Sequence, residues 1–136
     1  MGKRRRAREE VLKLLYESEV GGRPLQDVVS DFLEASRLDS DVKQFVNAIV
    51  RLVDRYIYEI DERVERVIVN WPMDRLAMVD KCILRSAIAE MLYFKDTPVK
   101  VVIDEAVSIA KKFSTADSGR FVNGILDRIA REEGLL

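Results

Sequence analysis

The sequence predicts an all-α protein, a compact bundle of six or seven helices joined by short loops. Three observations support this fold class. Apolar residues recur at intervals of three and four along nearly the whole chain, which is the spacing of an amphipathic helix. No stretch alternates apolar and polar residues convincingly, as a half-buried strand would. The 136 residues contain no low-complexity tract and no long linker, so we expect one domain over residues 1–136.

The first helix is expected from Lys3 to Glu19, because residues at helical spacing share one face. That face is formed by Ala7, Val11, Leu14, Leu15 and Ser18. Gly21 and Gly22 end this helix, and Pro24 suits the first turn of a second one. The second helix carries the apolar residues Leu25, Val28, Val29, Phe32 and Leu33.

A third helix is expected after the capping residues Asp39–Asp41. Its inward residues are Phe45, Ile49, Leu52, Val53 and Tyr56. The apolar pattern continues to Ile68, so the sequence allows either one long helix or two, with Asp61 as the cap of the second. The segment Asn70–Pro72 is interpreted as a stop.

A central helix is expected from Asp74, its cap, to about Phe94. The apolar residues of this segment cover a wide arc: Leu76, Val79, Ile83, Leu84, Ala87, Ile88 and Met91. A helix that is apolar over so much of its circumference belongs in the middle of a bundle.

Two further helices are expected after the turn at Asp96–Pro98, the first of them beginning at Pro98 and ending at Phe113. A loop over Ser114–Asp117 then leads to the last helix, which runs from about Ser118 to Glu132. Either Asp117 or Ser118 caps this helix. Its inward residues are Val122, Ile125, Leu126 and Ile129.

The composition excludes several kinds of catalytic site. The chain has no histidine, so Cys–His and Ser–His nucleophilic catalysis is excluded and the commonest metal ligand is missing. Cys82 lies in the central apolar helix and is interpreted as a core residue. A metal site built from Asp80, Glu90 and Glu105 is conceivable, but we favour Glu90 as an acceptor for backbone N–H groups at a neighbouring helix start.

We therefore expect a protein that is not an enzyme and has no metal or cofactor. No signal peptide or membrane-spanning segment is visible, because charges interrupt every apolar run. The sequence thus predicts a cytoplasmic protein without a membrane partner.

The charge of the chain is balanced overall but unevenly distributed. It has 23 basic and 24 acidic side chains, yet the segment 3–8, here called the arginine tip, holds only basic ones. These are Lys3, Arg4, Arg5, Arg6 and Arg8. Such asymmetry is typical of an arm that binds a polyanion, and the alternative is a disordered, solubilising N-terminus.

Two aromatic positions indicate binding surfaces. On a helical wheel Arg5, Leu12 and Tyr16 share a second face of the first helix, where Leu12 and Tyr16 form either an exposed anchor for a protein partner or a contact with a neighbouring helix. In the last helix Phe121 falls about a quarter-turn off the inward face, beside Arg120, where its ring is suited to stacking on an unpaired base.

Gly124 is an unusual residue for the interior of a helix, where glycine costs about 1 kcal/mol relative to alanine. The missing side chain suggests that another group approaches the helix closely at this position. That group is either a neighbouring helix or a ligand.

Four segments together resemble the NusB family of bacterial transcription antitermination factors. They read RRRARE at Arg4–Glu9, ILRSAIAEM at Ile83–Met91, PVKVVIDEAVSIAKKF at Pro98–Phe113 and DSGRFVNGILD at Asp117–Asp127. The resemblance covers essentially the whole chain and is strongest after residue 71.

The resemblance implies two packed helical subdomains and a set of partners. Members bind the boxA element of ribosomal RNA leader transcripts together with ribosomal protein S10 (NusE), and the pair joins NusA, NusG and RNA polymerase. Carried over by position, the RNA-binding residues are Arg4, Arg5, Arg6, Arg8, Asp117, Arg120 and Phe121. Tyr16 and Asp80 are carried over as part of the surface that faces S10, with Phe113 at its border, and Leu12 is added to this surface from its place beside Tyr16 on the wheel.

Other classes of protein remain open at this stage. One is a helical protein-interaction module without an RNA role, in which the arginines only confer solubility. Another is a fragment of a ribosomal RNA cytosine-5 methyltransferase that carries a NusB-like domain, and a third is a carboxylate metalloenzyme. A homodimer is also open, since a second copy could cover the arginine tip or the strip at Leu12 and Tyr16.

Overall fold

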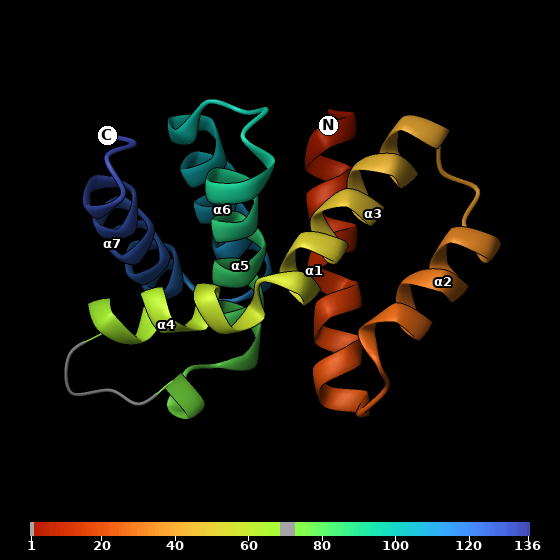
Figure 1. Cartoon of the computed structure of the whole chain (residues 1–136), viewed down its shortest axis with the longest axis horizontal. Coiled ribbons are helices and arrows are strands. Elements are labelled where there is room, and N and C mark those ends of the chain that lie inside the picture. Colours follow the sequence, from red (N-terminus) through yellow and green to blue (C-terminus); the bar gives the residue numbers. More distant parts are fainter. Residues whose placement is uncertain (1, 69–72) are drawn as a thin grey trace.

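The computed structural model describes residues 2–68 and 73–136 and confirms the all-α prediction (Figure 1). Seven α-helices and no strand are found in these two ranges. The helices are α1 (Lys3–Gly21), α2 (Leu25–Ala35), α3 (Ser40–Arg55), α4 (Ile57–Val67), α5 (Met78–Ala89), α6 (Val99–Phe113) and α7 (Ala116–Glu132). The stop expected at Asn70–Pro72 lies outside the described residues.

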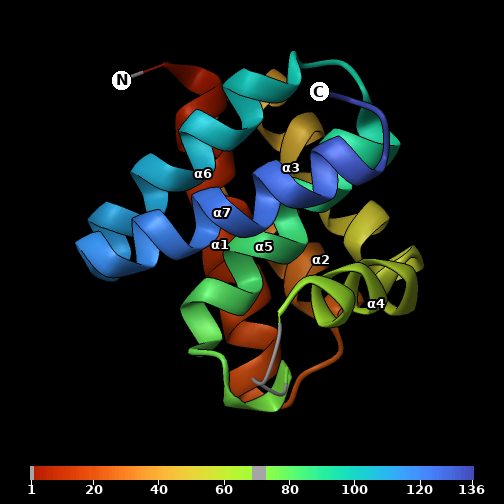
Figure 2. The ribbon, with the colours of Figure 1, turned by 90° about the vertical axis from the view of Figure 1, so that its left-hand side faces the viewer.

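The helices form two groups that pack on each other through α5. Helices α1, α2 and α3 contact one another at one end of the long axis, and α4, α6 and α7 lie around α5 toward the other end (Figure 1). Seen from the side of the second group, α7 lies in front and packs along α6, and α1 stands behind them (Figure 2). Because α5 contacts α1, α3, α4, α6 and α7, the expected central position of this helix is confirmed.

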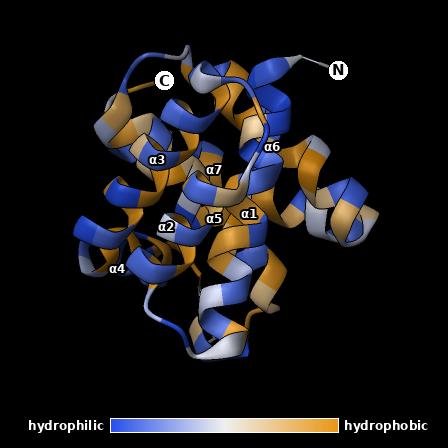
Figure 3. Ribbon diagram, turned by 90° about the vertical axis from the view of Figure 1, so that its right-hand side faces the viewer, coloured by the Kyte–Doolittle hydropathy of each residue, from blue (hydrophilic) through white to orange (hydrophobic). Residues whose placement is uncertain are grey.

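The core is apolar and is supplied by most of the helices. Its largest fully buried side chains include Ile49 of α3, Ile60 of α4, Leu84 and Ile88 of α5 and Leu126 of α7. Hydrophobic residues face the interior of the bundle, and the N-terminal end of α1 is hydrophilic (Figure 3).

Cys82 is part of this core, as expected. It is fully buried, and burial raises the pKa of its thiol to about 12, which leaves it protonated and unreactive at neutral pH.

Several helix ends follow the sequence signals. Gly22 has a left-handed φ of 70°, which favours glycine, and its N–H donates to the carbonyl oxygen of Ser18 at 3.0 Å, closing α1. Pro24 and Pro98 stand immediately before α2 and α6, where a missing backbone N–H costs little. Glycine and proline therefore mark these boundaries correctly.

The break between α3 and α4 falls at Tyr56, so the expected cap at Asp61 is wrong. Tyr56 leaves helical geometry with a φ of −109°, and its ring stacks on Tyr93 with 3.8 Å between ring centroids. Asp61 lies within α4 and accepts two hydrogen bonds from the Arg85 guanidinium, at 2.9 and 2.8 Å. A contact with a residue distant in sequence therefore replaced the local cap.

The central helix begins later than expected, and Asp74 does not cap it. Residues Met73–Arg75 form a separate 3₁₀ turn, after which the chain places Leu76 in the core and restarts the helix at Met78. Beyond Ala89 the helix widens into a π-helix over Glu90–Phe94, which ends at Lys95 with a φ of 60°.

The cap of α7 is Thr115, so the expected cap at Asp117 or Ser118 is also wrong. The Thr115 hydroxyl accepts a hydrogen bond from the backbone N–H of Ser118 at 3.0 Å, and the helix begins at Ala116. The loop is therefore shorter than expected. The Ser118 hydroxyl points into the protein and donates to Asp80 Oδ2 at 3.2 Å.

A buried ion pair joins α1 to the π-helix. Arg8 Nε donates to Glu90 Oε1 at 2.9 Å and Arg8 Nη2 to Glu90 Oε2 at 2.7 Å, and the two residues are only 7% and 1% exposed. Glu90 thus binds a guanidinium rather than the backbone N–H groups of a helix start, which corrects that expectation. Arg8, which was expected at an RNA-binding surface, is likewise a buried residue in a structural ion pair.

We expect Glu90→Gln to lower the free energy of unfolding by about 3–5 kcal/mol, because it leaves the buried Arg8 charge with only the more distant Glu105 carboxylate, at 3.9 Å. The double variant Arg8→Met/Glu90→Leu removes both charges and is expected to be more stable than Glu90→Gln. Urea denaturation of the three proteins measures the difference. A double variant at least as unstable as the single one would contradict this account of the pair.

Candidate nucleic-acid interface

The arginine tip is helical from Lys3 onward, and its exposed cations lie against carboxylates. The alternative of a disordered N-terminus is therefore wrong for these residues. The ion pairs are Lys3 with Asp39 and Asp41, Arg4 with Asp96, Arg5 with Glu105, and Arg6 with Glu10, at N–O distances of 2.7 to 3.4 Å. Most of these carboxylates come from other parts of the chain, so the folded protein partly neutralises the tip.

Arg4 also packs on two aromatic rings. Its guanidinium carbon lies 4.4 Å from the Phe45 ring centroid and 5.7 Å from that of Phe94, and the two rings meet edge to face. Phe94 is the last residue of the π-helix, so this turn contributes to the platform. Cation–π packing restrains a long side chain and leaves the N–H groups at its edge able to bind an acceptor. This platform could not be predicted from the sequence, because its rings lie far from Arg4 in the chain.

The start of α7 presents the second set of expected RNA-binding residues. Asp117 and Arg120 form an ion pair with each other and are strongly exposed. Phe121 is half-buried and packs against the edge of the core, so part of its ring remains accessible. These residues therefore lie on the surface, as expected.

Helix α6 lies between the two expected RNA-binding regions (Figure 2). Arg5 of the tip donates to Glu105 of this helix at 2.7 Å, and Lys112 donates to Glu9 of α1 at 3.0 and 3.1 Å. Lys100 and Lys111 occupy exposed positions on α6 and form no ion pair with any residue in the ranges 2–68 and 73–136. A nucleic-acid strand that contacted both regions would therefore cross α6, the helix that carries these two unpaired lysines.

The space beside Gly124 is open. If a Cβ were added at Gly124, no atom of the described residues would lie within 4 Å of it, apart from the two adjacent residues and the surrounding helix backbone. Close packing against a neighbouring helix therefore does not explain this glycine. In α7 it is Gly119 that packs closely against another helix, because a Cβ added there would lie 2.9 Å from Lys111 Cγ of α6. The expectation that a neighbouring helix approaches closely at Gly124 is therefore wrong.

The surface expected to face a protein partner contains an apolar hollow of about 250 Å³. Leu12, Lys13, Tyr16, Val79 and Phe113 line it, with Tyr16 and Phe113 exposed at 41% and 36%. Leu12 is buried at 5% exposure, so of the two alternatives it forms a contact within the bundle, whereas Tyr16 is exposed. Lys13 and Val79 were not predicted as part of this surface, and Val79 joins the hollow because α1 packs beside α5.

Asp80 follows Val79 in α5 and is largely buried. Its Oδ2 accepts a hydrogen bond from Ser118, whereas its Oδ1 has no hydrogen-bond partner within the described part of the chain. Burial raises the pKa of the Asp80 carboxyl, and hydrogen bonds from Ser118 and Ser114 oppose that rise.

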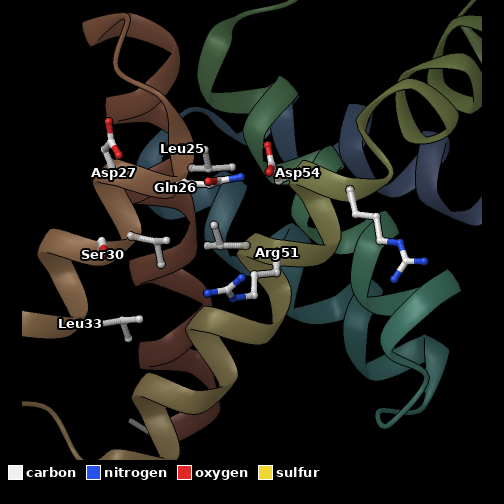
Figure 4. Close-up of a pocket in the computed structure, with 10 residues that line it drawn as sticks. Leu25, Gln26, Asp27, Ser30, Leu33, Arg51 and Asp54 are labelled. Carbon is white, nitrogen blue, oxygen red and sulfur yellow. The ribbon is translucent and has the colours of Figure 1, made fainter.

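A larger groove of about 560 Å³ runs between α2 and α3, on the other side of the molecule from α7 (Figure 4). Leu25 and Leu33 line it together with charged residues such as Arg51 and Asp54. None of the RNA-binding or partner-facing residues expected from the sequence belongs to its lining.

The carboxylates that could have formed a metal site are occupied otherwise. Glu90 is bound by Arg8 and Glu105 by Arg5, and Asp80 is bonded to Ser118. Across residues 2–68 and 73–136, no group of three or more acidic or cysteine side chains is arranged to hold a metal ion. In the same residues, no helix has the length and apolar character needed to cross a membrane.

A sequence model of the NusB family matches residues 5–131, which is nearly the whole chain. The chain belongs to the NusB family. A curated relative, the transcription antitermination protein NusB of Methylacidiphilum infernorum, is 43% identical over 132 residues, covering 96% of this chain and 92% of the relative. The resemblance expected from the four sequence segments is therefore confirmed.

Solved structures of NusB share the fold. NusB of T. maritima is 38% identical, covers 97% of this chain and 92% of its own, and superposes with a TM-score of 0.89. A crystal structure of the antitermination factors NusB and NusE in complex with double-stranded RNA matches with a TM-score of 0.87 at 27% identity, covering 97% of this chain and 98% of that one. The second structure shows that a NusB fold can hold NusE and RNA together.

We expect Asp80→Asn to raise the free energy of unfolding at neutral pH by roughly 1 kcal/mol, the lower end of the cost of an unsatisfied buried group. Since the folded-state pKa is raised, the native protein holds the Asp80 proton more tightly than the unfolded chain does. The associated stability is present at pH values below the usual carboxyl pKa of 3.8 and is lost as the pH rises through the raised value.

Urea denaturation of both proteins between acidic and neutral pH measures this contribution, and the variant is expected to show the weaker pH dependence. A variant that is less stable than the wild-type protein at neutral pH would show instead that the Asp80 charge is needed for folding.

Proposed function

We propose that this protein is a non-catalytic transcription antitermination factor that binds boxA-type single-stranded RNA of ribosomal RNA leader transcripts together with ribosomal protein S10 (NusE). The observation that carries the proposal is the ordered arginine tip of a NusB-family chain, with Arg4, Arg5 and Arg6 at the surface. A cytoplasmic complex with NusA, NusG and RNA polymerase is the setting that the family resemblance implies.

The arginine tip supplies the phosphate contacts in this proposal. Arg4, Arg5 and Arg6 each form an ion pair with a carboxylate, so an RNA phosphate has to replace that carboxylate as it binds. Exchange of one anion for another yields less free energy than neutralisation of a free arginine. RNA affinity without a protein partner is therefore expected to be modest. Arg8 takes no part, because Glu90 and the surrounding core enclose it.

Phe121 supplies a stacking surface for a base, with Arg120 and Asp117 beside it. One side of its ring packs against the core, so the side chain is already held in place before RNA binds. Stacking on a base therefore costs little additional side-chain entropy. Stacking on an aromatic ring tolerates any base, and sequence preference would come from other contacts.

The hollow lined by Tyr16, Val79 and Phe113 is the proposed docking surface for S10. It offers an apolar centre with two exposed aromatic rings, the arrangement typical of an interface anchor. The chain outside the tip is acidic, which suits a basic ribosomal protein. S10 bound here would add RNA contacts of its own, and the two ligands would then strengthen each other's binding.

A helical protein-interaction module without an RNA role is the second candidate. One observation favours it: the exposed arginines of the tip already have carboxylate partners, so the tip can be explained as a stabilising feature of α1. The two candidates differ in whether RNA binding depends on salt and on these arginines.

The deciding measurement is titration of a labelled single-stranded boxA RNA at two salt concentrations, with and without S10. We expect the RNA to bind more tightly when S10 is present. We also expect the logarithm of the binding constant to fall linearly with the logarithm of the salt concentration, with a slope to which each neutralised phosphate contributes about 0.7. Arg5→Ala/Arg6→Ala should reduce the slope by about 0.7 for each phosphate that is no longer neutralised. Arg66→Ala, which removes an exposed arginine of α4, serves as the matched control and should leave the slope unchanged.

Binding that is absent with folded S10 present, or a slope insensitive to the tip arginines, would favour the interaction module. A duplex of the same sequence, titrated in parallel, shows whether the protein prefers unpaired bases.

We expect Phe121→Leu to weaken RNA binding by about five- to a hundredfold, since base–aromatic stacking contributes about 1–3 kcal/mol. Leucine keeps apolar packing at the edge of the core, so the urea midpoint should change little. Unchanged RNA affinity, or a large loss of stability with affinity reduced only in proportion to unfolding, would assign Phe121 to the core alone.

A further inference from the structure

The outward side of α7 has a gap in its side chains at Gly124. Residues three and four positions away are neighbours on a helix surface, so Arg120, Phe121, Asp127 and Arg128 surround this gap. Gly124 is exposed, and an added Cβ would find open space among the described residues. The helix backbone is therefore accessible from outside at Gly124.

Nothing within the described chain accounts for the missing side chain. Gly124 does not have the left-handed φ that favours glycine, since it lies within a continuous helix. It is also not at a close approach to another element, unlike Gly119 beside Lys111. Alanine would fit and would favour the helix, because glycine is the poorest helix former after proline. Alanine would thus stabilise the helix at position 124, and the folded protein has room for its methyl group.

We propose that Gly124 is the point at which the sugar–phosphate backbone of single-stranded RNA lies directly against α7. This inference rests on the proposed RNA-binding function and adds a residue to its site. Phe121, one turn earlier, stacks on a base of the same strand. The bare Cα at Gly124 lets the strand approach the helix closely enough for the guanidinium groups of Arg120 and Arg128 to reach its phosphates from both sides.

The chemistry around Gly124 favours RNA over a protein as the occupant. The surrounding residues are charged apart from one aromatic ring, and cations next to an aromatic ring are typical of single-strand binding surfaces. The centre of a protein interface is instead depleted of charge. The apolar hollow with that protein-interface character is lined by residues of α1, α5 and the end of α6, and none of α7.

The carboxylates near the gap do not prevent this contact. Arg120 is paired with Asp117, and Arg128 with Glu132 at 3.0 Å, while Asp127 is held by Arg131 at 2.9 Å. All three pairs are exposed, and exposed ion pairs are weak enough for a phosphate to displace. The same exchange of anions as at the arginine tip would occur here.

The test compares Gly124→Ala and Gly124→Leu with the wild-type protein in urea denaturation and in titration with the single-stranded boxA RNA. Gly124→Ala is expected to raise the urea midpoint while weakening RNA binding by about five- to tenfold, which corresponds to about 1–1.4 kcal/mol. Gly124→Leu is expected to weaken RNA binding further. Ser30→Ala favours the helix at an exposed position of α2, at the opposite end of the molecule, and should leave RNA affinity unchanged (Figure 1).

The outcomes separate this inference from the proposed function. If the wild-type protein binds RNA and both Gly124 variants bind it equally well, the contact at Gly124 is refuted and the proposed function stands. If RNA affinity is unchanged but S10 binds the variants more weakly, the gap belongs to a protein interface and the inference also fails. If the wild-type protein does not bind RNA with S10 present, the proposed function itself fails.

Discussion

The buried ion pair between Arg8 and Glu90 ties the arginine tip to the rest of the bundle. Charges inside a protein are tolerated only with a well-aligned partner, so the pair fixes both the rotation of α1 and the position of the π-helix after α5. In the same orientation of α1, Ala7 and Val11 lie in the core, and Arg5 turns toward α6. Arg8 is therefore enclosed, whereas its neighbours in the basic run reach the solvent.

The positions of the helices could be predicted from the sequence, whereas several of their ends could not. Periodicity reports which residues are apolar, and burial of those residues drives helix formation within the bundle. A cap, in contrast, is one hydrogen bond, and distant partners compete for it. Asp61 binds Arg85 instead of capping a helix, and Thr115 caps α7 ahead of Asp117 and Ser118. Local signals decided the boundary where backbone geometry left no alternative, as at Gly22 and Pro98.

The candidate site could be predicted in its composition but not in its tertiary contacts. Arg4 and Arg8 are one helical turn apart and look alike in sequence, yet one lies on aromatic rings at the surface and the other inside the protein. The difference arises because Glu90 and Phe94, which lie far along the chain, meet α1 in the fold. Tyr16 was identified by its position on a wheel, but Val79 joins the same hollow only through tertiary packing. No sequence interval encodes either contact.

The pairing of the arginine tip with carboxylates also shapes how the protein samples its surroundings. The field of a paired arginine falls off with distance like that of a dipole, whereas a free arginine acts as a full charge out to about 10 Å at ordinary ionic strength. The tip therefore attracts polyanions only after they have come close. If the protein has the function proposed above, collisions with unrelated transcripts would therefore be short, because the paired arginines of the tip add little long-range attraction. The protein would then stay available for a ligand whose shape matches its surface, even in a cell crowded with nucleic acid.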